Sequence, residues 1–503
     1  MLWYCLLCVI YLDDIKYQNP NIGINSVFTL TLKFFLLISA NNPFLGDLYD
    51  RSLELAKLLE KQKKEGVTLL PFNEILYCNV GNPHLCGQKP LTFFRQVVAL
   101  TEYPELLNSP NAESMFPRDV VSRSCRLLSA IVHTGAYSST TGVKGILQNI
   151  ANFIEKRDGH PSDPSTIFIT DGATQSVRSI LHFLISGRDD GIMTPVPQYP
   201  LYTISIKLNG GTEVFYYLNE ESNWSLEITE LERAYQDSVA KGVTPRALVI
   251  INPGNPTGQI LDESNMKEIV LFCHKKSMIL IADEVYQGSI FTDERPFISF
   301  KKVVCDLGEQ VSGIELVSVH SISKGPIGEC GKRGGYMELH GFSKSVIDEM
   351  VKLASFSMCP NVIGQVLIDL MVCPPVEGDE SYPTYKVERD ATMNSLRDHA
   401  KLLVDTLNSL EGVTCNQPMG SLYAMPRLRL PPAAIAEAKS LGREPDEHYC
   451  LQLLEEKGIL VTSGNAFGQR EGTYHFRSTF LPPMEKVCKG LKEFHENFML
   501  KYK

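Results

Sequence analysis

Short apolar runs alternate with helical patterns through the middle of the chain, and this alternation constrains the fold more than any other feature of the sequence. Runs of five or six residues suit strands, whereas a longer amphipathic stretch such as 173–186 suits a helix. Strands that alternate with helices form a parallel sheet with crossover helices on its faces. The predicted strands are 166–170, 191–196, 246–251, 278–282 and 315–320. The sequence therefore predicts an α/β fold with a mostly parallel sheet flanked by helices.

A chain of 503 residues is too long for one small core, so we expect more than one domain. A large domain is predicted at 131–375, where the alternation lies. A smaller α+β domain is predicted at 376–503, which contains a long helical pattern from Tyr385 to Leu410 and strand-like segments at 420–426 and 474–480. Residues 47–130 are predicted to contribute to the small domain and to the edge of the active site.

The first 46 residues form an atypical hydrophobic extension before a helical pattern at 47–65. Its two apolar runs, 1–12 and 27–40, fall short of the roughly 18–20 residues that cross a bilayer. No positive region precedes Leu2, as a signal peptide would require, and the segment is not arginine-rich. We expect no firm membrane partner. An incorrectly joined first exon is one hypothesis for the segment, and recovery of peptides from residues 1–40 would contradict it.

Charge and composition exclude several classes of protein. The net charge of −10 would repel nucleic acid, so no nucleic-acid partner is predicted. An odd count of 13 cysteines indicates free thiols in a reducing compartment instead of a disulfide framework. The 11 histidines show no HExxH or paired metal spacing, so no metal site is predicted. The composition is that of an ordinary globular enzyme.

Residues with distinctive chemistry follow the predicted strands directly. Lys324 stands in Ser-Ile-Ser-Lys-Gly after one strand, Asp283 follows another, and Asn255 follows a third. The carboxyl ends of parallel strands share the sheet edge at which ligands bind. A lysine that forms a Schiff base, with a carboxylate on the pyridinium nitrogen, is how proteins use pyridoxal 5'-phosphate (PLP). We therefore predict an internal aldimine on Lys324, with Asp283 on the ring nitrogen and Asn255 and Tyr286 donating to the ring O3′.

Further residues suit the phosphate and the ring of the same cofactor. The stretch Gly172-Ala173-Thr174 opens a predicted helix, whose free N–H groups and dipole favour an anion. Hydroxyls and a guanidinium would complete the phosphate site, and an aromatic face would stack on the ring. The additional predicted cofactor-binding residues are Tyr199, Ser321 and Arg333.

The substrate requires a second arginine. Arg477 offers a bidentate fork for an amino-acid α-carboxylate, and Gly81 would allow close backbone approach to it. Asn255 is predicted to bind the substrate as well as the cofactor. Each residue alone also has an ordinary explanation, such as a surface lysine, a turn at Asn-Pro-Thr-Gly or a helix start. Together these explanations would require every residue to reach one ligand-binding edge by chance. The combination favours a PLP site.

Several longer passages carry a family resemblance. They resemble the class-I, fold-type I PLP-dependent aminotransferases, and within these the alanine aminotransferases, from about residue 47 to the C-terminus. The passages are 87–96, 135–138, 195–202, 252–259, 328–336 and 467–477. The resemblance implies a large PLP-binding domain and a homodimer with active sites at the subunit interface, partly formed by residues 47–130. It also implies that Tyr137 reaches the cofactor phosphate of the partner subunit.

The reaction implied by the resemblance is reversible ping-pong transfer from L-alanine to 2-oxoglutarate, which yields pyruvate and L-glutamate. The expected partners are therefore small amino acids and 2-oxo acids. A glutamate:glyoxylate aminotransferase is the alternative, although the C-terminal Lys501-Tyr502-Lys503 is not a peroxisomal signal of the Ser-Lys-Leu type. A PLP-binding homologue without activity, or a regulator with a DNA-binding domain, is a more remote alternative. The expected location is the cytoplasm, with the mitochondrion as the alternative.

Two passages depart from the family pattern near the predicted site. Pro326-Ile327 follows the Lys324-Gly325 pair where the family often has a bulky aromatic residue or methionine. Residues 462–466 differ from the usual proline-glycine turn. Neither departure removes a residue with a predicted chemical role. The prediction of the fold therefore stands, and the two departures affect only the prediction of fine substrate specificity.

Overall fold

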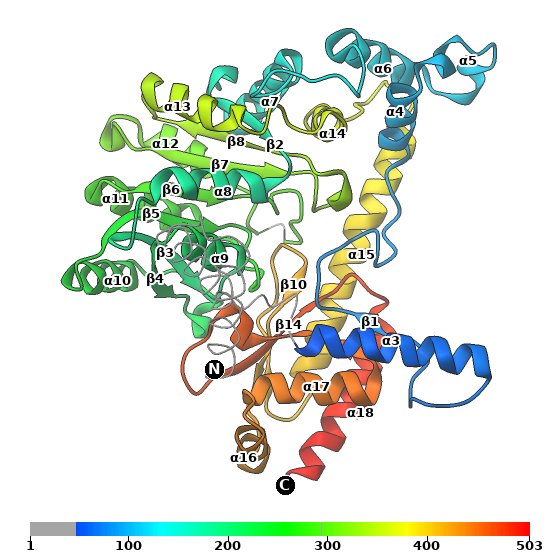
Figure 1. Cartoon of the computed structure of the whole chain (residues 1–503), viewed down its shortest axis with the longest axis vertical. Helices are drawn as coiled ribbons and strands as arrows, with labels where there is room; N and C mark the ends of the chain where they lie inside the picture. The colour runs from blue at the N-terminus through cyan, green and yellow to red at the C-terminus, as the bar shows by residue number, and fades with distance from the viewer. Residues whose placement is uncertain (1–46, 293) are drawn as a thin grey trace, which may run out of the picture.

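The structure is a computed structural model that describes residues 47–292 and 294–503; the predicted N-terminal extension at 1–46 lies outside these ranges. A seven-stranded sheet, in the order β2-β8-β7-β6-β5-β3-β4, occupies one half of the molecule (Figure 1). Neighbouring strands from β4 to β7 run parallel, whereas β8 is antiparallel to both of its neighbours. The strands are β2 Ile167–Thr170, β3 Asp190–Val196, β4 Thr212–Tyr217, β5 Thr244–Ile251, β6 Ile279–Asp283, β7 Leu316–Ser321 and β8 Gly335–His340. The predicted α/β fold with a mostly parallel sheet is confirmed.

Apolar side chains on both faces of each central strand cause helices to cover the sheet on both sides. In β5, Val249 packs into one core cluster, and its neighbours Leu248 and Ile250 pack into another on the opposite face. Helices α8, α9 and α13 supply the first cluster, and α10, α11 and α12 supply the second. These helices are α8 Ala173–Leu184, α9 Leu201–Leu208, α10 Ile228–Ala240, α11 Glu263–Lys276, α12 Phe300–Leu307 and α13 Lys344–Ser355.

A third core cluster lies beside the β2 edge, where helices pack against each other as well as against the sheet. Side-chain caps fix helix starts: Asn361 Oδ1 accepts from Ile363 N–H at 2.9 Å before α14, and Asp262 Oδ1 accepts from Asn265 N–H at 2.8 Å before α11. The helices of this cluster are α4 Thr92–Glu102, α6 Arg118–Ile131, α7 Lys144–Asp158 and α14 Val362–Val372. The short helix α5 spans Ala112–Met115.

The second half of the molecule is built on a smaller antiparallel sheet, in the order β10-β14-β11-β9, with β13 also paired to β14. The long helix α15, Tyr382–Asn408, runs from the α4 region down to this sheet (Figure 1). Helices around the sheet are α3 Asp47–Glu65, α16 Pro432–Ser440, α17 Pro445–Lys457 and α18 Met484–Lys501. The strands are β9 Val413–Thr414, β10 Tyr423–Ala424, β11 Arg427–Leu428, β13 Thr462–Ser463 and β14 Tyr474–Thr479.

The segment before the large sheet joins this second half in space. Strand β1, Leu76–Tyr77, pairs in parallel with β12, Ile459–Leu460, and α3 packs on α17. Short 3-10 helices complete the described structure: η1 Pro104–Asn108, η2 Pro164–Thr166, η3 Glu220–Ser222, η4 Gly308–Val311, η5 Cys330–Lys332 and η6 Gly464–Phe467. Among the described residues, no helix is both long and apolar enough to span a membrane. The domain boundaries given above remain predictions.

Candidate active site

The predicted site residues meet at the carboxyl edge of the seven-stranded sheet. Asp283 is the last residue of β6 and Ser321 the last residue of β7, with Lys324 three residues further on. Asn255 follows β5, and Tyr199 follows β3. Because these four strands are parallel, their following residues gather at one edge. The structure thus brings together residues up to 125 positions apart in the sequence.

One cavity of about 220 Å³ opens among these residues. We divide its lining into a sheet side, contributed by the large sheet and α8, and an Arg477 side. The predicted residues on the sheet side are Ala173, Thr174, Tyr199, Asn255, Asp283, Tyr286, Ser321, Lys324 and Arg333. The Arg477 side consists of Gly81, Tyr423 and Arg477. The cavity therefore contains all predicted site residues except Gly172, which borders it, and Tyr137.

Lys324 contacts the segment that precedes the sheet. Its Nζ donates to the Gly81 carbonyl oxygen at 2.5 Å. A Cβ atom on Gly81 would lie 2.3 Å from the Tyr423 hydroxyl and 3.3 Å from Lys324 Nζ, so a larger residue cannot fit without displacing Tyr423. Glycine at this position therefore lets the backbone approach the lysine closely.

Asp283 is a buried carboxylate, 5% exposed, and burial raises its pKa to about 6. The Tyr202 hydroxyl donates to its Oδ2 at 2.9 Å, and Val285 N–H lies 3.4 Å from Oδ1. These hydrogen bonds lower the pKa of Asp283 and so oppose the effect of burial. A cation placed in the cavity beside Asp283 would stabilise the charged form further. The position suits a positively charged ring nitrogen.

Arg477 is a fully buried cation with an exposed fraction of only 1%. Its Nη1 donates to Asn255 Oδ1 at 3.1 Å and its Nη2 to the Asn79 carbonyl oxygen, so its partners within the described residues are neutral oxygens. Its Nε is buried without a partner there. The guanidinium lies between the rings of Tyr423 and Phe467, with Cζ 4.1 and 4.5 Å from their centroids.

Burial lowers the pKa of Arg477, because a desolvated charge is costly, although a guanidinium stays protonated in proteins. A buried cation held by neutral groups is a binding site for an anion, since an anion supplies the missing charge. Burial also raises the pKa of Tyr286, whose hydroxyl lies 3.5 Å from Asn255 Nδ2. Asn255 therefore connects the Arg477 side of the cavity with the sheet side.

The start of α8 and Arg333 bring a second group of hydrogen-bond donors together, of a kind that suits an anion. Gly172 precedes α8 with φ +87°, so Ala173 and Thr174 present the free N–H groups of the first turn. Arg333 donates to the Asp171 carbonyl at 2.9 Å and to the Cys330 carbonyl at 3.0 Å. A Cβ on Gly172 would lie 2.4 Å from Arg333 Nη2. Glycine here keeps the guanidinium against the helix start.

Besides Gly172, Tyr137 is the predicted site residue that the cavity lining does not include. It lies in the loop between α6 and α7 and is 78% exposed. Its predicted role requires a second copy of the chain, so that role remains a prediction. Tyr199, by contrast, is half-buried in the cavity lining, and the desolvation of its hydroxyl raises the pKa of that group.

Sequence reasoning missed three aromatic residues of the site: Tyr202, Tyr423 and Phe467. Tyr202 lies within one of the quoted passages but was given no role, although its spacing from Tyr199 on one helical turn was a usable signal. For Tyr423, burial acts to raise the pKa of the hydroxyl, but the positive charges of Lys324 and Arg477 outweigh it and lower that pKa. Tyr423 and Phe467 reach the site only through the tertiary fold.

Comparisons with known proteins agree with this geometry. Residues 109–491 match the family model described as aminotransferase class I and II. The chain is 55% identical over 463 residues to a probable mitochondrial alanine aminotransferase of Dictyostelium discoideum, which covers 91% of this chain and 87% of the relative. It is 47% identical over 462 residues to glutamate–glyoxylate aminotransferase 1 of Arabidopsis thaliana, covering 91% and 93% of the two chains.

Among solved structures, the alanine aminotransferase of Pyrococcus furiosus aligns with a TM-score of 0.68 at 21% identity, over 92% of this chain and 100% of that one. This likeness supports the fold alone. The family match and the relatives above establish that the chain belongs to the class I and II aminotransferases. It is an aminotransferase enzyme, and the predicted membership in this family is confirmed.

Proposed function

We propose that this enzyme is a PLP-dependent alanine aminotransferase that converts L-alanine and 2-oxoglutarate to pyruvate and L-glutamate, reversibly. One observation carries the proposal: buried Arg477, held by neutral oxygens, faces the same cavity as Lys324 and Asp283. An α-carboxylate is common to all four substrates, and a guanidinium fork binds a carboxylate in a fixed orientation. The similarity to alanine aminotransferases supports the choice of amino donor.

The residues on the sheet side fit PLP. The start of α8 with Thr174, Ser321 and Arg333 would hold the phosphate, and Asp283 would hold the protonated ring nitrogen. Tyr199 offers a flat face to the ring, and Asn255 and Tyr286 offer donors to its oxygen. Lys324 is the residue to which the cofactor would be attached. The space that Gly172 leaves beside Arg333 supports this assignment, because a side chain there would displace the guanidinium.

When bound, PLP supplies an electron sink that stabilises the negative charge left on the substrate Cα after loss of a proton. Lys324 Nζ would take that proton from the substrate Cα and deliver it to the cofactor carbon that carries the amino nitrogen, which requires a neutral amine. Arg477 would fix the carboxylate, so that the Cα–H bond faces Lys324. Asp283, shielded from water, would keep the positive charge on the ring nitrogen.

The test is a steady-state assay of pyruvate formation from L-alanine with 2-oxoglutarate, on the wild type and on Lys324→Ala. We expect turnover in the wild type and a loss of at least about 10⁴-fold in the variant, because the proton-transfer group and the attachment point are both removed. Unchanged unfolding temperature is the control for folding. Turnover that persists in Lys324→Ala would disprove the role of the lysine.

A glutamate:glyoxylate aminotransferase is the second candidate, because a relative with this name is 47% identical to the chain. Both activities need the same cofactor and the same α-carboxylate site. The assay separates them when glyoxylate replaces 2-oxoglutarate as acceptor. A higher kcat/KM with 2-oxoglutarate supports the alanine aminotransferase, and a preference for glyoxylate with glutamate as donor supports the second candidate.

We also propose a homodimer in which exposed Tyr137 completes the phosphate site of the partner subunit. Tyr137→Ala and Lys324→Ala would each inactivate a homodimer, but a hybrid of the two variants contains one intact site. Random mixing makes half of the dimers hybrids, so activity should recover to about one quarter of the wild type. No recovery after exchange of subunits would contradict this arrangement.

The name of the Dictyostelium relative supports a mitochondrial location for this enzyme, against the predicted cytoplasm. The residues that would carry a targeting signal fall in the part of the chain that the structure does not describe. Fractionation of cells that express the full chain, with immunodetection of its C-terminal region, tests the proposal. Recovery with mitochondria would support it, and recovery in the cytosol alone would contradict it.

A further inference from the structure

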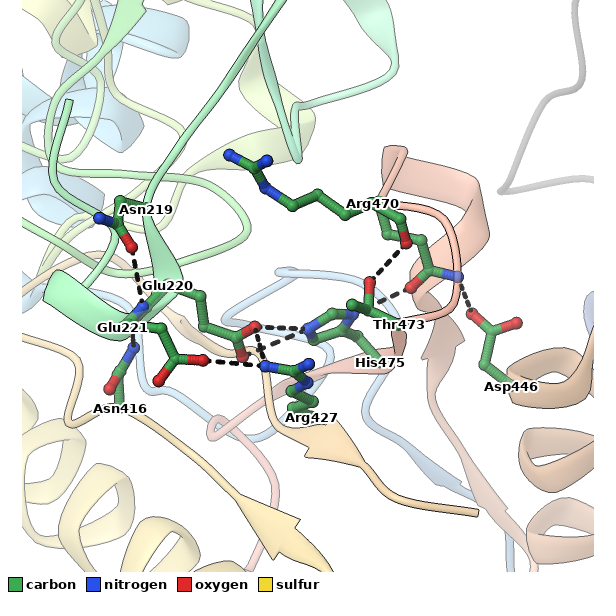
Figure 2. Close-up of polar contacts among 10 residues, drawn as sticks. Asn219, Glu220, Glu221, Asn416, Arg427, Asp446, Arg470, Thr473 and His475 are labelled. Carbon is green, nitrogen blue, oxygen red and sulfur yellow. Dashed lines mark hydrogen bonds and ion pairs between the residues drawn. The ribbon is translucent and has the colours of Figure 1, made fainter. Parts of the chain in front are cut away.

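Next to the cavity, a chain of polar side chains joins the two halves of the molecule. His475 lies on β14, two residues before Arg477, and is only 3% exposed. Its Nε2 lies 3.1 and 3.2 Å from the two carboxylate oxygens of Glu220, which belongs to η3 after the edge strand β4 of the large sheet. Figure 2 shows Glu220 between the imidazole of His475 and the guanidinium of Arg427.

The other ring nitrogen of His475 connects to the loop that follows β13. His475 Nδ1 lies 2.9 Å from Gln469 Oε1, and Gln469 Nε2 donates to Asp446 Oδ2 at 3.0 Å. Asp446 is fully buried on α17 and also accepts from Asn465 N–H at 2.8 Å. Because Asp446 attracts the amide nitrogen of Gln469, the amide oxygen faces the imidazole. Both nitrogens of His475 therefore face acceptor oxygens.

This loop contacts Arg477 directly. Phe467 lies within it, and the ring of Phe467 covers one face of the Arg477 guanidinium at 4.5 Å. The Phe467 carbonyl accepts from Gln198 N–H, of the large-sheet half, at 2.8 Å. The loop is thus held on one side by Gln198 and on the other by the series Glu220, His475, Gln469 and Asp446, which we call the latch.

A bidentate contact to a carboxylate depends on the orientation of the guanidinium plane. Two Nη contacts and two flanking rings set that plane, and Phe467 is the flanking ring carried by the latched loop. Within the described residues, no partner holds Nε. The latch therefore contributes to the orientation of Arg477 without touching the substrate itself.

We propose that Glu220 and His475 are positioning residues that hold the 464–470 loop against Arg477 and so set the affinity for the substrate α-carboxylate. This inference rests on the proposed function. Every substrate of the reaction carries that carboxylate, so the latch acts equally on the amino acid and on the 2-oxo acid. The sheet side of the cavity is outside its reach.

The test compares Glu220→Ala with Glu221→Ala. Glu221 is the matched control, because it precedes the same turn and pairs with Arg427 at 3.0 Å but makes no contact with His475 among the described residues. We expect Glu220→Ala to raise the KM for alanine and for 2-oxoglutarate together, by about tenfold, since a hydrogen bond to a charged group is lost. The kcat should change by less than about twofold, and Glu220→Gln, which keeps an acceptor oxygen, should restore part of the affinity.

Hydrogen exchange provides a readout that does not depend on turnover. Amides of residues 464–470 should exchange faster in Glu220→Ala than in Glu221→Ala, while peptides of β6 and β7 stay unchanged. Faster exchange with unchanged KM values would overturn the proposal, because the latch would then be structural only. Equal KM effects of both variants would overturn it as well. A wild type without any turnover would disprove the proposed function, and the exchange comparison would still decide whether the latch holds the loop.

Discussion

The two sides of the cavity are built in different ways. The sheet side comes from strand ends and one helix start between residues 172 and 333, and parallel strands fix these positions through continuous backbone pairing. The Arg477 side comes from segments far apart in the sequence, Gly81, Tyr423 and Arg477, with Phe467 packed on the guanidinium. These segments meet through the pairing of the two-residue strands β10 and β13 with β14 and through side-chain contacts. The rigid side suits a permanent cofactor, and the assembled side suits a substrate that enters and leaves.

This difference has an energetic consequence. Each side contains a buried ionisable group for which we propose a ligand as the partner: Asp283 on the sheet side and Arg477 on the other. A buried charge without an opposite charge costs free energy, and the ligand compensates for that cost when it binds. Burial raises the pKa of Asp283, so this carboxylate can bind a proton and lose its charge. A guanidinium cannot release its proton in the accessible pH range. The Arg477 side therefore retains its charge under all conditions.

We expect the largest effect in this comparison from a substitution that changes the Arg477 side and leaves the sheet side intact. Arg477→Lys keeps the charge but removes the planar fork and the contacts between the two rings. We expect KM for both alanine and 2-oxoglutarate to rise by about 100-fold, which corresponds to a loss of about 2–3 kcal/mol of binding free energy. PLP affinity, measured by absorbance titration, should stay within about twofold. A large loss of PLP affinity would show that the two sides are not separable.

The second effect concerns the sheet side and its pH dependence. Burial raises the pKa of Asp283 to about 6, so between about pH 4 and 6 the folded protein without PLP binds more protons at this group than the unfolded chain. The contribution of Asp283 to stability therefore falls as pH rises through this window. Relative to Asp283→Asn, the free energy of unfolding of the wild type should fall by on the order of 2 kcal/mol between pH 4 and 7.

Denaturant unfolding of both proteins without PLP, at several pH values, measures this difference. A difference in unfolding free energy that does not vary with pH would contradict the assignment. At pH 7, addition of PLP should make the wild type more stable than Asp283→Asn, which reverses the sign of the difference in unfolding free energy. The reason is that the ring nitrogen then supplies a positive partner to the carboxylate, which only the wild type has. Asp446 serves as an internal comparison: burial raises its pKa too, but it belongs to the latch and should not respond to PLP.

The same contrast explains what could be predicted from the sequence. The five predicted strands match β2, β3, β5, β6 and β7 within two residues at each end, because strands buried on both faces are continuous apolar runs. The predicted helices at 47–65 and 385–410 match α3 and α15 closely, because the apolar residues of these segments recur at helical spacing. Since the site on the sheet side follows from strand ends, its residues were predictable as well.

Two strands of the large sheet, and the aromatic residues Tyr423 and Phe467 beside Arg477, were not predicted. Strand β4 lies at the sheet edge and is half exposed, and β8 contains Glu338, whose charge hides the strand pattern in the sequence. In the fold, Lys301 compensates Glu338 in a buried ion pair. Likewise, Tyr423 and Phe467 acquire their roles from Arg477, which lies ten or more residues away in the sequence. Local patterns do not contain this tertiary information.

We expect the smallest effects from substitutions at two glycines, one on each side of the cavity, and these substitutions test whether the two sides are separable. Gly172→Ala places a Cβ 2.4 Å from Arg333 Nη2 at φ +87°, and Gly81→Ala places one 2.3 Å from the Tyr423 hydroxyl. We expect Gly172→Ala to weaken PLP binding by about tenfold, because an unfavourable φ costs 1–2 kcal/mol and the guanidinium is displaced. Gly81→Ala should leave PLP binding unchanged and raise KM by about tenfold, because Tyr423 no longer lies flat against Arg477. Absorbance titration and steady-state kinetics on both variants measure the two constants, and equal effects on both constants would show that the cavity responds as one unit.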